Sequence, residues 1–293
     1  MTGSARWDDL GPRAVSGVAV AVVGIGALVA GDPWLSALAA AAGGVMIWEL
    51  SAMTAPGRPR EAQAMGLLAA IVLAALFLSH NPFALAWLLI PVVIGVLRPR
   101  HDRWGFAIAA FAMLMATYAI VAFRGGFGVW FVLWFALLVT AADTAAYFGG
   151  RTIGGPKFWP RLSPKKTWSG AVAGWLGAAL VGAAFWAAGM APVWIVPFSA
   201  LVAFASQMGD IGESAVKRRA GVKDASHLIP GHGGLMDRLD ALSGAALFLL
   251  AWGMVLPLPR IGARRRCAAS RSSAPQCRSE SRPLTCSRGP AGQ

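Results

Sequence analysis

The chain has 293 residues, of which 57% are hydrophobic and only 13% are charged. A soluble domain carries roughly 25% charged residues, so this composition excludes water as the main solvent for the protein surface. The net charge of +13 would suit nucleic-acid binding, but its distribution along the chain argues for a membrane protein with basic loops instead.

Nine apolar segments are long enough, or nearly so, to cross a hydrocarbon layer about 30 Å thick. They cover residues 14–30, 34–53, 64–79, 82–97, 104–123, 126–149, 170–189, 192–213 and 238–258. The third and fourth are short, and only His80 and Asn81 separate them. They form either two tilted spans or a re-entrant pair, and we favour two spans. The sequence therefore predicts an all-α, polytopic integral membrane protein of about nine transmembrane helices.

The basic residues predict the orientation of these spans. If the N-terminus is cytoplasmic, 17 of the 26 basic residues lie in cytoplasmic segments, whereas the short outside loops contain only Arg124. The opposite topology would reverse this asymmetry and violate the positive-inside rule. We therefore expect a cytoplasmic N-terminus and a multi-pass protein of the plasma (inner) membrane.

Residues 260–293 differ from the predicted membrane domain of residues 1–259. This tail is rich in Arg, Ser and Pro, has no periodicity, and is expected to be disordered. It contains all three cysteines, so neither a disulfide framework nor a cysteine metal site holds the apolar body. After nine spans its eight basic residues would lie outside, against the positive-inside rule. Either such a tail is tolerated, or it is not an evolved part of the domain and derives, for example, from a reading-frame change.

Carboxylates inside spans or at their ends are costly and tend to mark function. Five fall there, namely Glu49, Asp143, Asp210, Glu213 and Asp240. All except Glu49 border the two large cytoplasmic loops, and this clustering predicts a site. Glu49 is expected to reach the interface from the end of the second span, and the sequence assigns it no role.

The eighth span ends in SQMGDIGESAVKRR, and a continuous helix would place several polar residues on one face. These residues are Ser206, Asp210, Glu213, Ser214 and Lys217. At the start of the ninth span, Asp237 and Asp240 also share a face because they stand three positions apart. Carboxylates of this kind suit Mg²⁺, which usually takes one or two of them plus substrate phosphates. The alternative is a set of salt bridges, joining Asp210 or Glu213 to Lys217 and Asp237 to Arg238.

The two large cytoplasmic loops both favour an anionic ligand. In one loop, Gly233 and Gly234 permit close approach of the backbone to a phosphate, and His232 is expected to contact phosphate or backbone rather than metal. The other loop contains Lys165 and Lys166 beside the hydroxyl groups of Ser163 and Thr167. Those lysines either bind an anion or anchor the loop at lipid head groups. The nearby Asp143 favours the first interpretation, since it would pair with the lysines or help to hold a cation.

The segment from Ser214 to Asp240 resembles the signature of the phosphatidate cytidylyltransferases (CDP-diacylglycerol synthases). The matching positions read Ser214-Ala-Val-Lys217-Arg218, then four residues, Lys223-Asp224, and then Pro230-Gly-His232-Gly233-Gly234-Leu-Met-Asp237-Arg238-Leu-Asp240. Asp143 with Tyr147, the SPKKTW stretch and the GDxxES stretch also resemble that family, so the catalytic part is expected mainly within residues 143–243. Ser169 stands where the family is expected to carry Glu, which puts any role for that position in doubt.

The resemblance implies that CTP and phosphatidate react at the cytoplasmic face to give CDP-diacylglycerol and pyrophosphate, with Mg²⁺ required and a second cation left open. It implies catalytic roles for Asp210, Asp237, Lys217 and Arg238, and a metal set of Asp210, Glu213, Asp237 and Asp240. It implies substrate contacts by Asp143, Ser163, Lys165, Lys166, Thr167, Ser214, Arg218, Lys223, Asp224, His232, Gly233 and Gly234. Membrane lipid is an expected partner and nucleic acid is not, and a homodimer is left open.

Two other functions compete with this interpretation. One is a CTP-dependent kinase or transferase that acts on another membrane lipid, such as a polyprenol. The other is a transporter, but transporter sites usually lie near the bilayer midplane and often within inverted repeats. Here the acids gather at one interface and no repeat is evident, which favours an enzyme. Acyl-chain preference and the choice between CTP and dCTP are not encoded in any pattern of this sequence.

Overall fold

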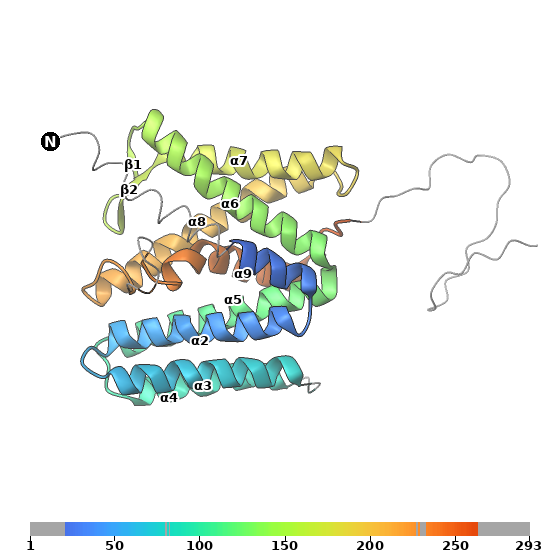
Figure 1. Cartoon of the computed structure of the whole chain (residues 1–293). Coiled ribbons are helices and arrows are strands. Elements are labelled where there is room, and N and C mark those ends of the chain that lie inside the picture. The colour runs from blue at the N-terminus through green and yellow to red at the C-terminus, as the bar shows by residue number, and fades with distance from the viewer. Residues whose placement is uncertain (1–20, 80, 82, 227, 229–232, 263–293) are drawn as a thin grey trace, which may run out of the picture. The chain divides into compact units, whose positions relative to one another are not determined.

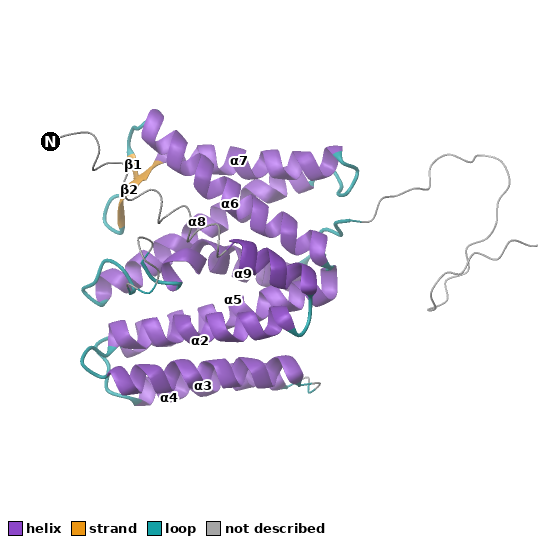
Figure 2. Cartoon of the chain, viewed as in Figure 1, coloured by secondary structure: helices purple, strands orange, loops and turns teal. Residues whose placement is uncertain are grey.

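The computed structural model describes residues 21–79, 81, 83–226, 228 and 233–262, with the side chains of residues 164 and 165 also left outside the description. The helices are Ala21–Ala30, α2 (Trp34–Thr54), α3 (Pro59–Leu78), η2 (Ala84–Leu88), α4 (Leu89–Leu97), α5 (Arg103–Phe127), α6 (Val129–Thr152), α7 (Trp168–Ala187), α8 (Ile195–Arg219) and α9 (Met236–Val255). Two short strands, β1 (Lys157–Trp159) and β2 (Ser163–Thr167), pair antiparallel between α6 and α7 (Figure 2).

Within the described residues, seven helices are long and apolar enough to cross a membrane: α2, α3, α5, α6, α7, α8 and α9. This confirms the predicted all-α, polytopic membrane fold. The first and fourth predicted spans correspond to shorter apolar helices, Ala21–Ala30 and Ala84–Leu97. The latter would reach only about 21 Å at 1.5 Å per residue, which is less than the hydrocarbon thickness. The beginning of the first predicted span, before residue 21, lies outside the described residues.

The loops that the sequence predicts to be cytoplasmic lie at one end of the helices (Figure 1). The α2–α3 loop, the α4–α5 loop, the β1–β2 hairpin and the described parts of the α8–α9 loop are found there, whereas the α5–α6 and α7–α8 connections lie at the opposite end. The hairpin was not predicted, because strands of three and five residues are too short to show a period-two pattern. Which end faces the cytoplasm stays a prediction.

Small residues bring the site-bearing helices close together. A Cβ atom on Gly209 of α8 would lie 2.7 Å from Gly244 Cα and 2.7 Å from the carbonyl oxygen of Asp240, both on α9. Similarly, a Cβ atom on Gly174 of α7 would lie 2.9 Å from the carbonyl oxygen of Ala142 on α6. Such contacts are typical of membrane helices, in which glycine lets two backbones approach closely. They bring α8 against α9 and α7 against α6, and Gly174 also faces Gln207 of α8.

Packing of the membrane domain extends slightly beyond the predicted boundary at residue 259. Ile261 is buried in the same core cluster as Phe131 and Trp134, and the backbone N–H of Gly262 donates to the carbonyl of Met190. The rest of the predicted disordered tail lies outside the described residues.

Candidate active site

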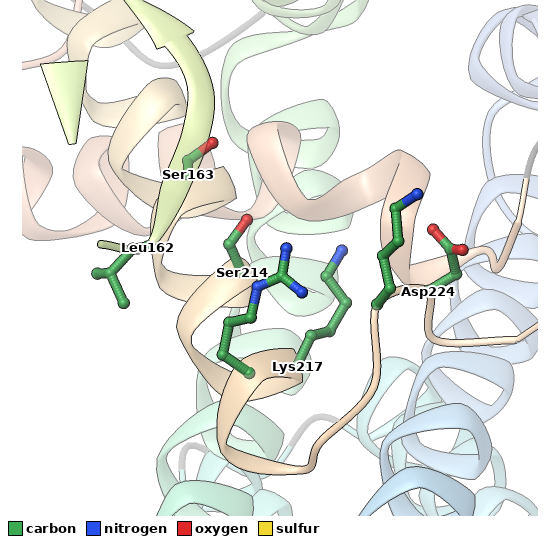
Figure 3. Close-up of a pocket in the computed structure, with 7 residues that line it drawn as sticks. Leu162, Ser163, Ser214, Lys217 and Asp224 are labelled. Carbon is green, nitrogen blue, oxygen red and sulfur yellow. The ribbon is translucent and has the colours of Figure 1, made fainter. Parts of the chain in front are cut away.

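A pocket lined mainly by charged residues and serines lies between the start of β2, the end of α8 and the loop after α8 (Figure 3). Its lining residues are Leu162, Ser163, Ser214, Lys217, Arg218, Lys223 and Asp224. Because α8 remains helical to Arg219, Ser214 and Lys217 share the face that borders the pocket. Three of the lining residues are cations and one is a carboxylate. Lys217 also pairs with two carboxylates next to the pocket, so Arg218 and Lys223 are the cations that best suit a ligand with several negative charges. All of the lining residues except Leu162 were predicted from the sequence as site residues.

Lys217 is the centre of a buried ion-pair cluster that joins α8 to α9. Its Nζ atom lies 2.9 Å from Glu213 Oε1 and 2.7 Å from Asp237 Oδ1. The side chains of Lys217, Glu213 and Asp237 are only 13%, 4% and 10% exposed, so water screens these attractions weakly. The structure confirms the Glu213–Lys217 salt bridge that the sequence left open, and it gives Lys217 a second carboxylate partner in Asp237.

A second charged cluster surrounds Asp210, earlier in α8. Lys166 of β2 forms an ion pair with Asp210, and its Nζ atom donates to the backbone carbonyl of Gln207 at 3.3 Å. Asp143 on α6 and Asp240 on α9 lie close enough to Asp210 for the like charges to repel, and Lys166 attracts Asp143. The ion pair of Lys166 is with Asp210, so the predicted pairing of Asp143 with a loop lysine stays a prediction.

Asp210 and Asp237 belong to different ion pairs, each with its own lysine. Asp240 connects the two clusters electrostatically, because it interacts with both Asp210 and Lys217. The single magnesium ion predicted between Asp210 and Asp237 therefore stays a prediction.

The turn that leads into α9 is built around Asp237. Asp237 Oδ2 accepts hydrogen bonds from the backbone N–H of Gly234 at 2.9 Å and of Ala225 at 3.1 Å. Gly233 has a φ of +81°, and a Cβ atom there would lie 2.8 Å from Asp237 Oδ2. Glycine at this position thus lets a carboxylate approach the backbone, whereas the sequence predicted that a phosphate would do so. The substrate contacts of Gly233 and Gly234 stay predictions.

Thr167, another predicted substrate contact, caps the N-terminus of α7. Its Oγ1 atom accepts a hydrogen bond from the N–H of Gly170 at 3.2 Å and lies 3.0 Å from Ser169 Oγ. Ser169 Oγ also donates to the carbonyl of Gly154. Ser169, the residue that departs from the expected family pattern, therefore holds the start of α7 against the preceding loop.

Three predicted site residues have limited descriptions. His232 lies outside the described residues, as does the side chain of Lys165. Arg238 lies within electrostatic reach of Asp143. Their predicted roles stay predictions.

Sequence reasoning missed one carboxylate of this region. The sequence predicted that the Glu49 side chain reaches the membrane interface, but the side chain is completely buried inside the protein. It accepts hydrogen bonds from Ser226, Leu235 and Met236. The only signal in the sequence was an isolated acid in an otherwise apolar span, and its partners stand at least 177 positions away.

The carboxylates of the site fit a magnesium ion by the chemistry of their oxygen atoms. Among the described residues, no three His, Cys, Asp or Glu side chains are grouped as ligands of one metal ion, but Mg²⁺ usually takes only one or two carboxylates. Within that same part of the chain, neither oxygen of the buried Glu213 accepts a well-formed hydrogen bond, although Lys217 lies beside it. Glu213 also interacts with Asp240. Buried carboxylate oxygens with unused lone pairs are the hard donors that Mg²⁺ prefers.

The fold and the site together define an integral membrane protein with a positively charged pocket and paired acids at one end of its helices. Comparison with known proteins identifies the family of the chain. The cytidylyltransferase family matches residues 12–255, which is most of the chain. The chain therefore belongs to the cytidylyltransferase family.

Individual relatives agree with this placement. The chain is 38% identical to a phosphatidate cytidylyltransferase of Brucella suis over 205 residues, which cover 61% of this chain and 76% of that protein. It is 37% identical over 190 residues to a phosphatidate cytidylyltransferase of Haemophilus influenzae, covering 59% of this chain and 58% of that protein. A Helicobacter pylori phosphatidate cytidylyltransferase is 32% identical over 180 residues, covering 60% of this chain and 67% of that protein.

Proposed function

We propose that the chain transfers a cytidylyl group from CTP to phosphatidate, giving CDP-diacylglycerol and pyrophosphate. The observation that carries this proposal is the positively charged pocket between β2, α8 and the following loop, in a chain of the cytidylyltransferase family. The names of its relatives support phosphatidate as the acceptor. Both substrates are polyanions, and one is a lipid, so a cationic site at one end of membrane helices suits them.

The reaction is a displacement at phosphorus. An oxygen atom of the phosphatidate phosphate attacks the α-phosphorus of CTP and forms the new pyrophosphate linkage. The bond from that phosphorus to the oxygen bridging to the β-phosphate breaks, and pyrophosphate leaves with the electron pair. A phosphate oxygen is already ionised at neutral pH, so no side-chain base is needed. The protein must align two like-charged groups and stabilise the developing charge.

The pocket residues supply this stabilisation. Lys217, Arg218 and Lys223 provide fixed positive charge near the leaving phosphates, and Arg is suited to bidentate contacts with phosphate oxygens. The hydroxyl groups of Ser163 and Ser214 line the same pocket and orient phosphate oxygens by donating hydrogen bonds. Because the cations are held in place before the substrate arrives, little reorganisation is required during the reaction.

Magnesium is part of this proposal. One or two of Asp210, Glu213 and Asp240 would hold the ion, together with substrate phosphates. Asp237 is a further candidate that would have to share its oxygens with Lys217 and the backbone. When bound, the ion would neutralise charge on the phosphate oxygens. Lys166 has a role that does not depend on the ion, because it balances the charge of Asp210 and fixes β2 against α8.

The location of the site is also proposed. The loops that border the pocket are the basic loops of the chain, and basic loops are retained on the cytoplasmic side. We infer a site at the cytoplasmic face of the plasma membrane, where CTP is available and phosphatidate can reach it from the bilayer. A homodimer stays a prediction.

Pyrophosphate release from CTP tests the proposed function. The purified protein is placed in vesicles that contain phosphatidate, diacylglycerol or a polyprenol, and pyrophosphate is measured with each lipid. Release that depends on phosphatidate supports the proposal. Release only with diacylglycerol or polyprenol would contradict it and favour a CTP-dependent transferase of another lipid. Release with no lipid would also contradict it, because it would indicate hydrolysis of CTP.

A further inference from the structure

Glu49 lies on α2, remote in sequence from every residue of the pocket, yet its side chain contacts the loop and turn between α8 and α9. Glu49 is 0% exposed. Its Oε1 atom accepts hydrogen bonds from Ser226 Oγ at 2.5 Å and from the N–H of Leu235 at 3.0 Å, and its Oε2 atom accepts one from the N–H of Met236 at 2.7 Å. A buried carboxylate is tolerated only when donors satisfy it, and here three donors do so.

These contacts supply a cap that α9 lacks locally. Leu235 occupies the N-cap position, and its apolar side chain makes no capping hydrogen bond. The first N–H groups of a helix have no partners within the helix, and a negative charge near them is favourable. Glu49 satisfies the N–H groups of Leu235 and Met236 from another helix, so it completes the N-terminus of α9.

Glu49 and Asp237 hold the same turn through successive backbone groups. The N–H of Gly234 donates to Asp237, and the next two N–H groups donate to Glu49. A Cβ atom on Gly234 would lie 2.7 Å from Glu49 Oε1, so glycine at that position admits the carboxylate. The contact from Ser226 connects the other side of the loop to the same oxygen. One buried side chain therefore fixes both ends of the α8–α9 loop against α2.

The turn before α9 also positions Lys217, one of the cations of the pocket. Asp237 follows Met236 directly, and its Oδ1 atom lies 2.7 Å from Lys217 Nζ. Lys217 lines the pocket with Ser214 and Arg218. A shift of the turn would move Asp237 away from Lys217. Lys217 would then be held by Glu213 alone, and its position relative to a bound phosphate would change.

We propose that Glu49 is a positioning residue for the active site: it fixes the turn before α9 and acts through Asp237 on Lys217. The role in turnover rests on the proposed cytidylyl transfer, whereas the role in holding the turn does not. Glu49 itself is expected to touch neither substrate.

Glu49→Gln tests the proposal. The variant keeps the size of the side chain but replaces one acceptor oxygen with an NH₂ group, which cannot accept a backbone N–H. We expect kcat to fall by about 100-fold, the cost typical of a misplacement of roughly 1 Å in an active site. The matched control is Glu61→Gln, which alters a carboxylate of α3 that pairs with Arg58 and Arg100. This control should keep kcat within about 3-fold of the wild type, because Glu61 and its partners do not line the pocket. Its melting temperature should fall, since the buried Arg100 loses a carboxylate partner.

A double-mutant cycle separates positioning from general loss of structure. If Glu49 acts through Asp237, the double variant Glu49→Gln/Asp237→Asn should be hardly slower than the slower single variant, because coupled sites are not additive. Glu61→Gln combined with Asp237→Asn should instead show the product of the two single effects. Multiplicative effects in the Glu49 cycle, or a Glu49→Gln enzyme with near-normal kcat, would overturn the proposal.

Hydrogen exchange gives a reading that does not depend on turnover. In Glu49→Gln, the amides of Leu235 and Met236 should exchange faster, whereas in Asp237→Asn the faster amides should be those of Gly234 and Ala225. Unchanged exchange at Leu235 and Met236 would refute the contact. A wild-type protein that releases no pyrophosphate would refute the proposed function alone, since the exchange result stands by itself.

A milder variant covers the case in which Glu49→Gln does not fold. Ser226→Ala removes one of the three hydrogen bonds to Glu49, together with the bond that Ser226 Oγ accepts from the N–H of Leu228. It leaves the carboxylate and both backbone contacts of Glu49 in place. We expect kcat about 5-fold lower, the effect of roughly 1 kcal/mol for one hydrogen bond, with a normal elution profile in detergent. Wild-type kcat together with wild-type exchange in Ser226→Ala would count against the proposal.

Discussion

Replacing Lys217 by Met should destabilise the protein as well as inactivate it. The side chain of Lys217 lies 2.9 Å from Glu213 Oε1 and 2.7 Å from Asp237 Oδ1, and none of the three side chains is more than 13% exposed. Methionine fills a similar volume but leaves both carboxylates without their shared cation. Removing one partner of a buried ion pair costs about 3–5 kcal/mol, because the remaining charge is left uncompensated. At about 2–4 °C per kcal/mol for a domain of this size, the melting temperature should fall by roughly 6–20 °C.

The assay is thermal unfolding of the purified variants in detergent, measured beside pyrophosphate release. Adding Glu213→Gln to Lys217→Met removes one of the two uncompensated charges and should recover part of the lost melting temperature without restoring activity. This recovery is specific to the buried cluster, since a residue that only touched substrate would leave stability unchanged. A Lys217→Met protein that melts like the wild type would refute the reasoning.

Three other perturbations test separate parts of the site and fold. Lys166→Ala should lower kcat/KM for CTP by about 10–100-fold, because the variant leaves Asp210 without its ion pair. The protein should still insert stably into the membrane. Loss of insertion would favour a role of Lys166 as a lipid anchor instead. Chelation of divalent cations should abolish activity and added Mg²⁺ should restore it, so full activity in excess chelator would exclude the proposed magnesium requirement. Gly209→Ala should cost about 1–3 kcal/mol of stability, because its Cβ atom would lie 2.7 Å from Gly244 Cα. The control Gly125→Ala should cost nothing, since no atom lies within 4 Å of its Cβ position. Equal stability of the two variants would contradict the packing of α8 against α9.

The membrane fold could be predicted because hydropathy reports directly on the solvent around a helix. The shared face of Asp210, Glu213 and Lys217 depended on the condition that the eighth span stays helical, and α8 does extend to Arg219. The helix Ala84–Leu97 was harder to predict, since an apolar segment of 14 residues satisfies a hydropathy pattern but is shorter than the hydrocarbon layer.

The partners of individual charges could be predicted only where they share a helix. Glu213 and Lys217 are four positions apart, so their contact follows from helix geometry. The contact between Asp237 and Lys217 depends on how α8 and α9 pack, which the close approach of Gly209 and Gly244 determines. Glu49 is the extreme case, because its donors come from a loop and a helix far along the chain, and no local pattern encodes them.

The most direct test of the account uses CTP labelled at one phosphorus at a time. The purified protein is incubated with phosphatidate vesicles and CTP labelled at either the α- or the γ-phosphorus, and the label in the lipid phase is counted. Cytidylyl transfer predicts that the α-label enters the lipid and that the γ-label is released as pyrophosphate. Gamma-label in the lipid, with the α-label left in soluble nucleotide, would contradict the account and show a CTP-dependent kinase.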